Sequence, residues 1–137
     1  MLKKTIYGVD VSKAKLDYSY FKNHWIDTVL GNTLAEIEAW VCTLNPKVDY
    51  IVLEHTGTYS NKLIEVLSKY DFTFSVVNPR RSNNYMNAIG MISKNDQSCA
   101  RALAHMGQVM DLPVYQSKRG ILKERWTYLF INPKEVF

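Results

Sequence analysis

The sequence is poor in the residues that build disulfide scaffolds, zinc ribbons and phosphate-binding loops. Its 137 residues include two cysteines, Cys42 and Cys99, and no Cys or Cys/His spacing typical of a structural metal site. The six glycines stand singly, which argues against glycine-rich loops that cradle nucleotide phosphates. No apolar run is typical of a signal peptide or a membrane span, so we expect no membrane partner and a reducing cytoplasm.

The chain does contain enough apolar sequence for one folded core. With 47% hydrophobic and 22% charged residues, its composition excludes a disordered, collagenous or low-complexity protein. The length is typical of a single domain. We expect that domain to span residues 1–112, and residues 113–137 to form a basic tail that resembles the truncated start of a helical segment.

Charge is unevenly distributed along the chain. Residues 1–78 hold 8 Lys and Arg against 9 Asp and Glu, whereas residues 79–137 hold 9 against 4. One interpretation is an acidic site in the first part and a surface for a polyanion in the second. The other is an ordinary solvated surface with uneven lysines, and charge alone does not separate the two.

The first thirty residues predict three short strands. Two patterns indicate this: β-rich composition and, in the second segment, apolar residues alternating with polar ones. Short turns separate the segments, as expected of an antiparallel meander. The predicted strands are Thr5–Val11, Lys15–Phe21 and His24–Leu30.

The remainder predicts helices that alternate with strands. Thr33 and Glu36 form a capping-box pattern at the start of the first helix. Next come a strand over Asp49–Glu54, a helix over Thr58–Tyr70, a strand over Phe72–Val77, an irregular stretch over 80–94 and a helix over Asp96–Met110. Three antiparallel strands followed by alternating elements is the order of an α/β, ribonuclease H-like domain with a mixed central sheet.

Two acids lie at the ends of apolar strands, where burial of a carboxylate costs free energy. Asp10 ends one apolar strand and Glu54 ends another, so each loses hydration unless a cation or hydrogen bonds compensate. For each acid alone, a strand end facing water or an acid that caps nearby backbone is the favoured explanation. If the two strands are neighbours, however, both carboxylates meet, and Asp96 opens a helix with position 99 one turn further on. Hard oxygen ligands of this kind bind Mg²⁺ or Mn²⁺.

Four short motifs occur in a recognisable order. They are Gly8–Lys13, Glu54–Tyr59, Val77–Pro79 and Lys94–Ala100. In this order they resemble the N-terminal, RuvC-like domain of the DEDD transposases of the insertion-sequence-110 type, a group that includes the Piv DNA invertases. The resemblance covers about residues 4–110 and implies a domain that binds divalent metal with four acids and acts on DNA phosphodiester bonds.

Carried over by position, the resemblance makes Asp10, Glu54 and Asp96 the first three catalytic metal ligands. The fourth acid should stand at Cys99, where a soft thiol is a poor ligand for a hard ion. The sequence favours the interpretation of Cys99 as a small buried helix residue. Family members also continue into a second domain with a catalytic serine, and no segment after Pro113 resembles it. Both departures favour a domain that is incomplete or inactive alone.

Basic and aromatic residues supply candidate nucleic-acid contacts. Lys13 and Lys15 lie beside Asp10, although hairpin lysines are often simply solvated. The stretch after Pro79 is the best candidate loop, because bases, amides and an aromatic ring hold phosphates and stack on nucleobases; an ordinary polar loop is the alternative. The candidates are Lys13, Lys15, Arg80, Arg81, Tyr85 and Lys94. The expected partners are DNA, a structured guide RNA, as the family resemblance implies, and further copies of the chain in a homo-oligomer.

Three functional hypotheses follow. The first is a metal-binding domain of a DNA transposase or recombinase. The second is a non-catalytic nucleic-acid-binding or dimerisation remnant of such a protein. The third is a fragment of a sugar-kinase or actin-type ATPase, which shares an opening strand with an Asp but requires the glycine-rich loops that this chain lacks.

Overall fold

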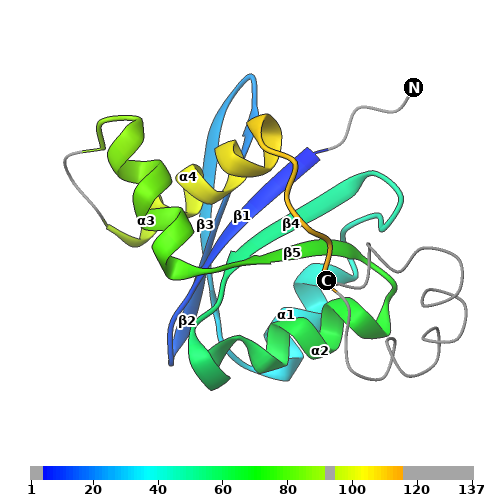
Figure 1. The fold of residues 1–137 in the computed structure, drawn as a ribbon. Helices are drawn as coiled ribbons and strands as arrows, with labels where there is room; N and C mark the ends of the chain where they lie inside the picture. Colours follow the sequence, from blue (N-terminus) through cyan, green and yellow to red (C-terminus); the bar gives the residue numbers. More distant parts are fainter. Residues whose placement is uncertain (1–4, 92–94, 116–137) are drawn as a thin grey trace, which may run out of the picture.

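A computed structural model describes residues 5–91 and 95–115 and contains a five-stranded mixed sheet (Figure 1). The order of the strands across the sheet is β3-β2-β1-β4-β5. Their bounds are β1 Thr5–Val11, β2 Lys15–Lys22, β3 His24–Gly31, β4 Asp49–Glu54 and β5 Thr73–Val77. The first and fourth strands are therefore neighbours, and the predicted ribonuclease H-like strand order is confirmed.

The first three strands form the predicted antiparallel meander. β1 pairs with β2 through partners such as Val11 and Leu16, and β2 pairs with β3 from Lys15 to Lys22. Asn23 makes the turn between β2 and β3 with a φ of 65°, a left-handed conformation that Asn tolerates better than most residues. β4 and β5 then join β1 in parallel, which requires crossover connections.

Helices α1 (Leu34–Val41) and α2 (Asn61–Lys69) cover one face of the sheet. Thr33 caps α1 by accepting a hydrogen bond from the Glu36 amide, as predicted. The helix predicted over 58–70 is shorter than expected, because Gly57–Ser60 form a 3₁₀ turn before α2. Apolar side chains of both helices and of the strands form one buried cluster on this face. It includes Val9, Leu16, Ile51 and Leu53 from the strands and Ile37, Leu63 and Leu67 from the helices.

Helices α3 (Pro79–Ala88) and α4 (Asp96–Val109) lie on the opposite face. A second apolar cluster forms there from Val52, Val77, Leu103, Met106 and Leu112. β4 is thus covered on both faces, as its nearly continuous apolar sequence predicts. None of the helices within residues 5–91 and 95–115 is long and apolar enough to cross a membrane.

The irregular stretch predicted over 80–94 is wrong for its first half. Pro79–Ala88 is helical because the Asn78 side chain caps the first turn by accepting a hydrogen bond from the Arg80 amide, and Pro79 occupies the first helical position. Residues 111–115 still pack on the domain, since Leu112 is buried and Tyr115 stacks on Phe74. The helical character predicted for the tail beyond residue 115 lies outside the described residues.

Candidate metal centre

Three acids stand side by side across the sheet, on the face covered by α4. Asp10 on β1 pairs directly with Asp17 on β2. On the other side of Asp10, the register pairs Val9 with Leu53, the residues that immediately precede Asp10 and Glu54. Side chains at paired positions of neighbouring strands point to the same face. The carboxylates of Asp10 and Glu54 therefore lie on neighbouring strands and on the same face of the sheet, as their predicted meeting requires.

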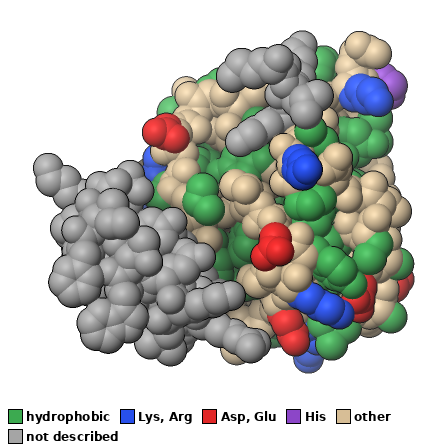
Figure 2. Space-filling view, turned by 90° about the vertical axis from the view of Figure 1, so that its right-hand side faces the viewer, with side chains coloured by type: hydrophobic (Ala, Val, Ile, Leu, Met, Phe, Trp, Pro, Cys, Tyr) green, Lys and Arg blue, Asp and Glu red, His purple; other side chains and the backbone are tan. Residues whose placement is uncertain are grey.

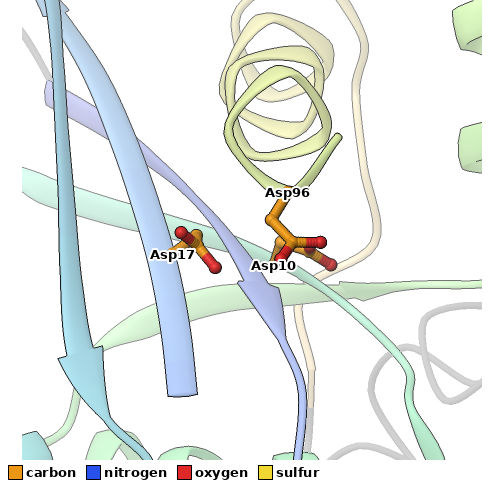
Figure 3. Close-up of side chains that lie close together, drawn as sticks. All are labelled: Asp10, Asp17 and Asp96. Atoms are coloured by element: carbon orange, nitrogen blue, oxygen red, sulfur yellow. The ribbon is translucent and has the colours of Figure 1, made fainter. Parts of the chain in front are cut away.

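Asp96 approaches this row from above, at the first turn of α4 (Figure 3). Asn95 and Ser98 form a capping box that fixes the start of the helix. Gly8 on β1 lets the helix backbone lie directly against the sheet, because a Cβ there would stand 1.9 Å from the Ala100 carbonyl oxygen. This close approach brings the carboxylate of Asp96 to that of Asp10.

The carboxylates of Asp10, Asp17 and Asp96 form a compact group. One oxygen from each lies within 4.8 Å of the others. Two oxygens bound to one Mg²⁺ at about 2.1 Å are at most about 4.2 Å apart, so small side-chain rotations close the group around an ion. All three donors are hard carboxylate oxygens, and this donor set fits Mg²⁺ or Mn²⁺.

The charge state of Asp10 reflects this environment. Burial raises the pKa of Asp10 to about 7, with further contributions from a hydrogen bond to Asp96 and from the negative charges of Asp96, Glu54 and Asp17. Crowded carboxylates cannot all ionise readily without a compensating cation. A divalent ion would therefore have a large favourable interaction at this point.

Lys15 already provides a positive charge in the group. Its ammonium nitrogen lies 3.3 Å from Asp17 Oδ2 and 3.1 Å from Asp96 Oδ2. These two carboxylates raise the pKa of Lys15, Asp96 contributing most. Lys15 is also a candidate nucleic-acid contact from the sequence; the structure shows its ion pairs with two carboxylates, and the nucleic-acid contact stays a prediction.

Glu54 stands slightly apart from the three aspartates. Its Oε2 accepts a hydrogen bond of 2.7 Å from the Ser82 hydroxyl on α3. Among the described residues it is not in the group whose ligand atoms lie within 4.8 Å of one another. Its charge nevertheless contributes to the raised pKa of Asp10, so it belongs to the same acidic site.

Cys99 lies one helical turn beyond Asp96 and is half-buried. Among the described residues, the group whose ligand atoms lie within 4.8 Å of one another contains the three carboxylates and not its thiol. The position at which the family resemblance puts a fourth acid thus adds no ligand here.

The predicted nucleic-acid residues fall into three groups. Arg80 and Arg81 are exposed on α3, and Lys13 is exposed in the β1–β2 turn. Tyr85 is half-buried, and its hydroxyl shares a short hydrogen bond with His105 Nδ1, which joins α3 to α4. Lys94 lies outside the described residues. Among the described residues visible in Figure 2, Lys and Arg side chains are interspersed with Asp and Glu side chains.

Asp17 is the site residue that the sequence reasoning missed. Its alternation with Leu16 and Tyr18 indicated a polar strand face but not a functional one. Two signals were available in the sequence. If four residues separate the paired positions Val11 and Leu16, residue 17 pairs with residue 10. The late helix also has an apolar face that must cover part of the sheet. Together they place Asp17 beside Asp10 and under α4.

Comparison with solved structures defines the fold class as RuvC-like. Over 82% of this chain and 99% of the other, the fold matches a Thermus thermophilus RuvC in complex with a Holliday junction substrate, with a TM-score of 0.54 and 8% identity. A second T. thermophilus RuvC structure matches with a TM-score of 0.50 and 10% identity over 73% of this chain and 90% of the other. The shared feature is the ribonuclease H-like sheet with its covering helices.

The sequence then identifies the family. The model of the IS110-type DEDD transposases, described as transposase, matches residues 7–124, and the chain belongs to this family. It is 28% identical over 123 residues to the pilin gene-inverting protein of Moraxella bovis and 27% identical to that of Moraxella lacunata. These matches cover 85% of this chain and 38% of each relative, so the chain spans well under half their length. The resemblance stated from the four motifs is confirmed.

Proposed function

We propose that this chain is the metal-binding domain of a DNA transposase or site-specific recombinase and acts on DNA phosphodiester bonds. The observation that carries the proposal is the assembly of Asp10, Asp96 and Asp17 into one group of carboxylates on a RuvC-like sheet. Membership of a transposase family supports DNA as the substrate. A bacterial relative named for gene inversion supports a role in recombination, and with it a place of action in the cytoplasm.

In this proposal Asp10, Asp96 and Glu54 are the catalytic carboxylates. A bound Mg²⁺ or Mn²⁺ supplies Lewis-acid stabilisation of charge on the phosphodiester oxygens. Asp10 holds the central position, since it lies between the acids of β2 and β4 and below the first turn of α4. Glu54 accepts a hydrogen bond from the Ser82 hydroxyl, which would orient its carboxylate as groups around a metal site commonly do.

Exposed groups of α3 and of the β1–β2 turn would hold the phosphate backbone. Arg80 and Arg81 project from a helix that is joined to the acidic site through the Ser82–Glu54 hydrogen bond. A hollow of about 430 Å³ beside this helix is lined by both arginines and by Asn84. Guanidinium and amide groups are suited to phosphate oxygens. The same surface could hold a structured guide RNA, and we include RNA and a homo-oligomer among the proposed partners.

The decisive experiment compares DNA nicking by three forms of the chain in Mg²⁺ or Mn²⁺. Supercoiled plasmid and branched duplexes serve as substrates. Asp10→Asn should lower the nicking rate by about a hundredfold or more, since even losing a group that orients a metal ligand typically costs 10- to 100-fold. Asp71→Asn is the matched control, because Asp71 is an exposed acid in the α2–β5 turn. Equal rates for wild type and Asp10→Asn would contradict the proposal.

A second function has one specific observation in its favour. The position at which the family resemblance puts a fourth acid holds the thiol of Cys99 and not a carboxylate. The domain would then be a non-catalytic nucleic-acid-binding or dimerisation remnant that needs other parts for recombination. Cys99→Asp distinguishes the two, because nicking should rise in this variant only if the other acids form a working site. DNA binding without nicking by either form would favour the remnant.

A further inference from the structure

Asp17 is not one of the acids that the family resemblance names, yet the fold places its carboxylate beside those of Asp10 and Asp96. We propose that Asp17 is a ligand of the divalent ion, in place of the acid missing at Cys99, and that Lys15 is the cation it exchanges. This inference rests on the proposed function, since it names a further ligand of the same site. It makes the ligand set of this chain differ from the one its motifs imply.

The burial of Asp17 is the first argument. Asp17 is 7% exposed, and α4 packs over the strand that carries it. A carboxylate this far from water is destabilised unless a cation or several donors compensate. Lys15 lies 3.3 Å away, but its own side chain is 44% exposed, so the compensating charge is itself partly in solvent. A divalent ion held between Asp17 and Asp10 would compensate the carboxylate more completely.

The position of Lys15 is the second argument. Its ammonium group lies between carboxylates from two elements, Asp17 on β2 and Asp96 on α4. A cation therefore fits between these two acids in both space and charge. Because Lys15 reaches the group along a flexible, exposed side chain, it can return to water when an ion binds, and little buried surface is lost.

The chemistry of the donor set is the third argument. With Asp17, one oxygen from each of three aspartates lies within 4.8 Å of the others. Without it, two carboxylates remain in this group, and the thiol of Cys99 is too soft to replace a hard oxygen. Mg²⁺ and Mn²⁺ are held through carboxylates together with water, so a third carboxylate beside Asp10 and Asp96 would strengthen binding.

The alternative is that Asp17 and Lys15 form a structural ion pair with no role in metal binding. In that case Asp17→Asn alters stability but leaves the affinity for Mn²⁺ unchanged. The two possibilities are separated by direct measurement of Mn²⁺ binding to the intact chain by electron paramagnetic resonance. Wild type, Asp10→Asn, Asp17→Asn and the charge control Asp71→Asn are compared, and far-UV circular dichroism checks that each is folded.

If Asp17 is a ligand, Asp17→Asn weakens Mn²⁺ binding by about tenfold or more, and Asp71→Asn changes it less than about twofold. If Asp10→Asn weakens binding but Asp17→Asn does not, the Asp17 inference is wrong and the proposed metal site stands. If wild type binds no Mn²⁺, or Asp10→Asn binds as wild type does, the proposed site fails as well. A crystal of wild type with Mn²⁺ needs no variant: its anomalous peak should lie about 2–2.5 Å from an Asp17 oxygen.

Lys15→Gln tests the exchange. Removing the competing ammonium should tighten Mn²⁺ binding several-fold, whereas Lys13→Gln, the same charge change at an exposed position of the same turn, should have less than about twofold effect. Weaker binding in Lys15→Gln would show that the ammonium holds the carboxylates in place, and would overturn its role as the exchanged cation.

Discussion

The guanidinium of Arg101 on α4 donates two hydrogen bonds to the carboxylate of Asp27 on β3, at 2.9 Å from Nε and 2.5 Å from Nη2. The Ser19 hydroxyl donates to the same carboxylate at 2.6 Å, and the guanidinium lies 5.6 Å from the centre of the Trp25 ring. This contact fastens α4 to the outer strands of the sheet. It thereby holds the first turn of α4, with Asp96, above the row of acids.

Arg101→Met should destabilise the domain by about 1–2 kcal/mol, because a bidentate, charge-assisted pair is lost from a half-buried position. The effect should depend on pH. Arg101 chiefly lowers the pKa of Asp27 to about 2, so the stabilisation is present above the unfolded pKa near 4 and is lost as the pH falls toward 2. Urea titrations between pH 2 and 7 measure this.

In that series, wild type and the control Arg81→Met should lose stability steeply from pH 4 to 2, since Arg81 is exposed on α3. In Arg101→Met, the free energy of unfolding should fall less steeply over the same pH range. The same slope in all three proteins would contradict the assignment of the acid transition to Asp27.

Asp10→Asn should stabilise the domain at neutral pH in the presence of EDTA. Burial raises the pKa of Asp10 to about 7, well above its unfolded value near 4, so its contribution to stability falls as the pH rises from 4 through 7. The full shift corresponds to about 4 kcal/mol; solvent screening at this half-exposed carboxyl reduces the expected gain to about 1–2 kcal/mol.

The gain should be small at pH 4, where Asp10 is protonated in the folded state and about half protonated in the unfolded state. It should also shrink when Mg²⁺ is added to wild type, because ligand binding stabilises the folded state. Denaturant titration at pH 4 and pH 8, with Asp71→Asn as control, gives the comparison. If Asp10→Asn were less stable than wild type at pH 8 without metal, the ionised carboxylate of Asp10 would not destabilise the folded domain, and the prediction would be wrong.

Part of this site could be predicted from the sequence because it depends on strand ends. Asp10 and Glu54 each lie near the end of a buried strand, and the alternation of elements implies that those strands are neighbours. Asp96 was recognisable as the first residue of a helix with an apolar face. These inferences need only local pattern and the strand order of the fold.

The remainder depends on turn geometry and on tertiary contacts. Asp17 reaches the centre through the exact length of the β1–β2 turn, and its burial comes from α4, which lies far away in sequence. Lys15 acquires its two partners for the same reason. The sequence does not reveal α3, because Asn78-Pro79 directly after an apolar strand fits a strand end as well as it fits a helix start; in the structure Asn78 caps the helix and Pro79 is its first residue.

The exposed arginines of α3 should contribute to nucleic-acid affinity through charge. Arg81→Ala is expected to weaken binding of duplex DNA uniformly across sequences and to reduce the slope of log affinity against log salt by about 1. Lys47→Ala is the control, because Lys47 is exposed in the loop that enters β4, at the end of the strand opposite Glu54. Fluorescence anisotropy at several salt concentrations measures both. Equal slopes for the two variants would remove α3 from the proposed interface.

Gly8→Ala should displace α4 and with it the carboxylate of Asp96. A Cβ at this position would stand 1.9 Å from the Ala100 carbonyl oxygen and 2.4 Å from the Ala104 amide nitrogen, both of which are backbone atoms of α4. The helix must therefore move away from β1, and we expect a loss of about 3 kcal/mol in the free energy of unfolding. Because Asp96 moves with α4, the affinity for Mn²⁺ should fall in the same variant.

Gly90→Ala separates this steric effect from the general effect of adding a methyl group to a glycine. Gly90 has a φ of +76°, and nothing lies within 4 Å of an added Cβ, so its substitution should cost about 1 kcal/mol through backbone strain and leave Mn²⁺ binding unchanged. Equal loss of stability in the two variants, or unaltered Mn²⁺ affinity in Gly8→Ala, would mean that the close approach of α4 to β1 does not position Asp96.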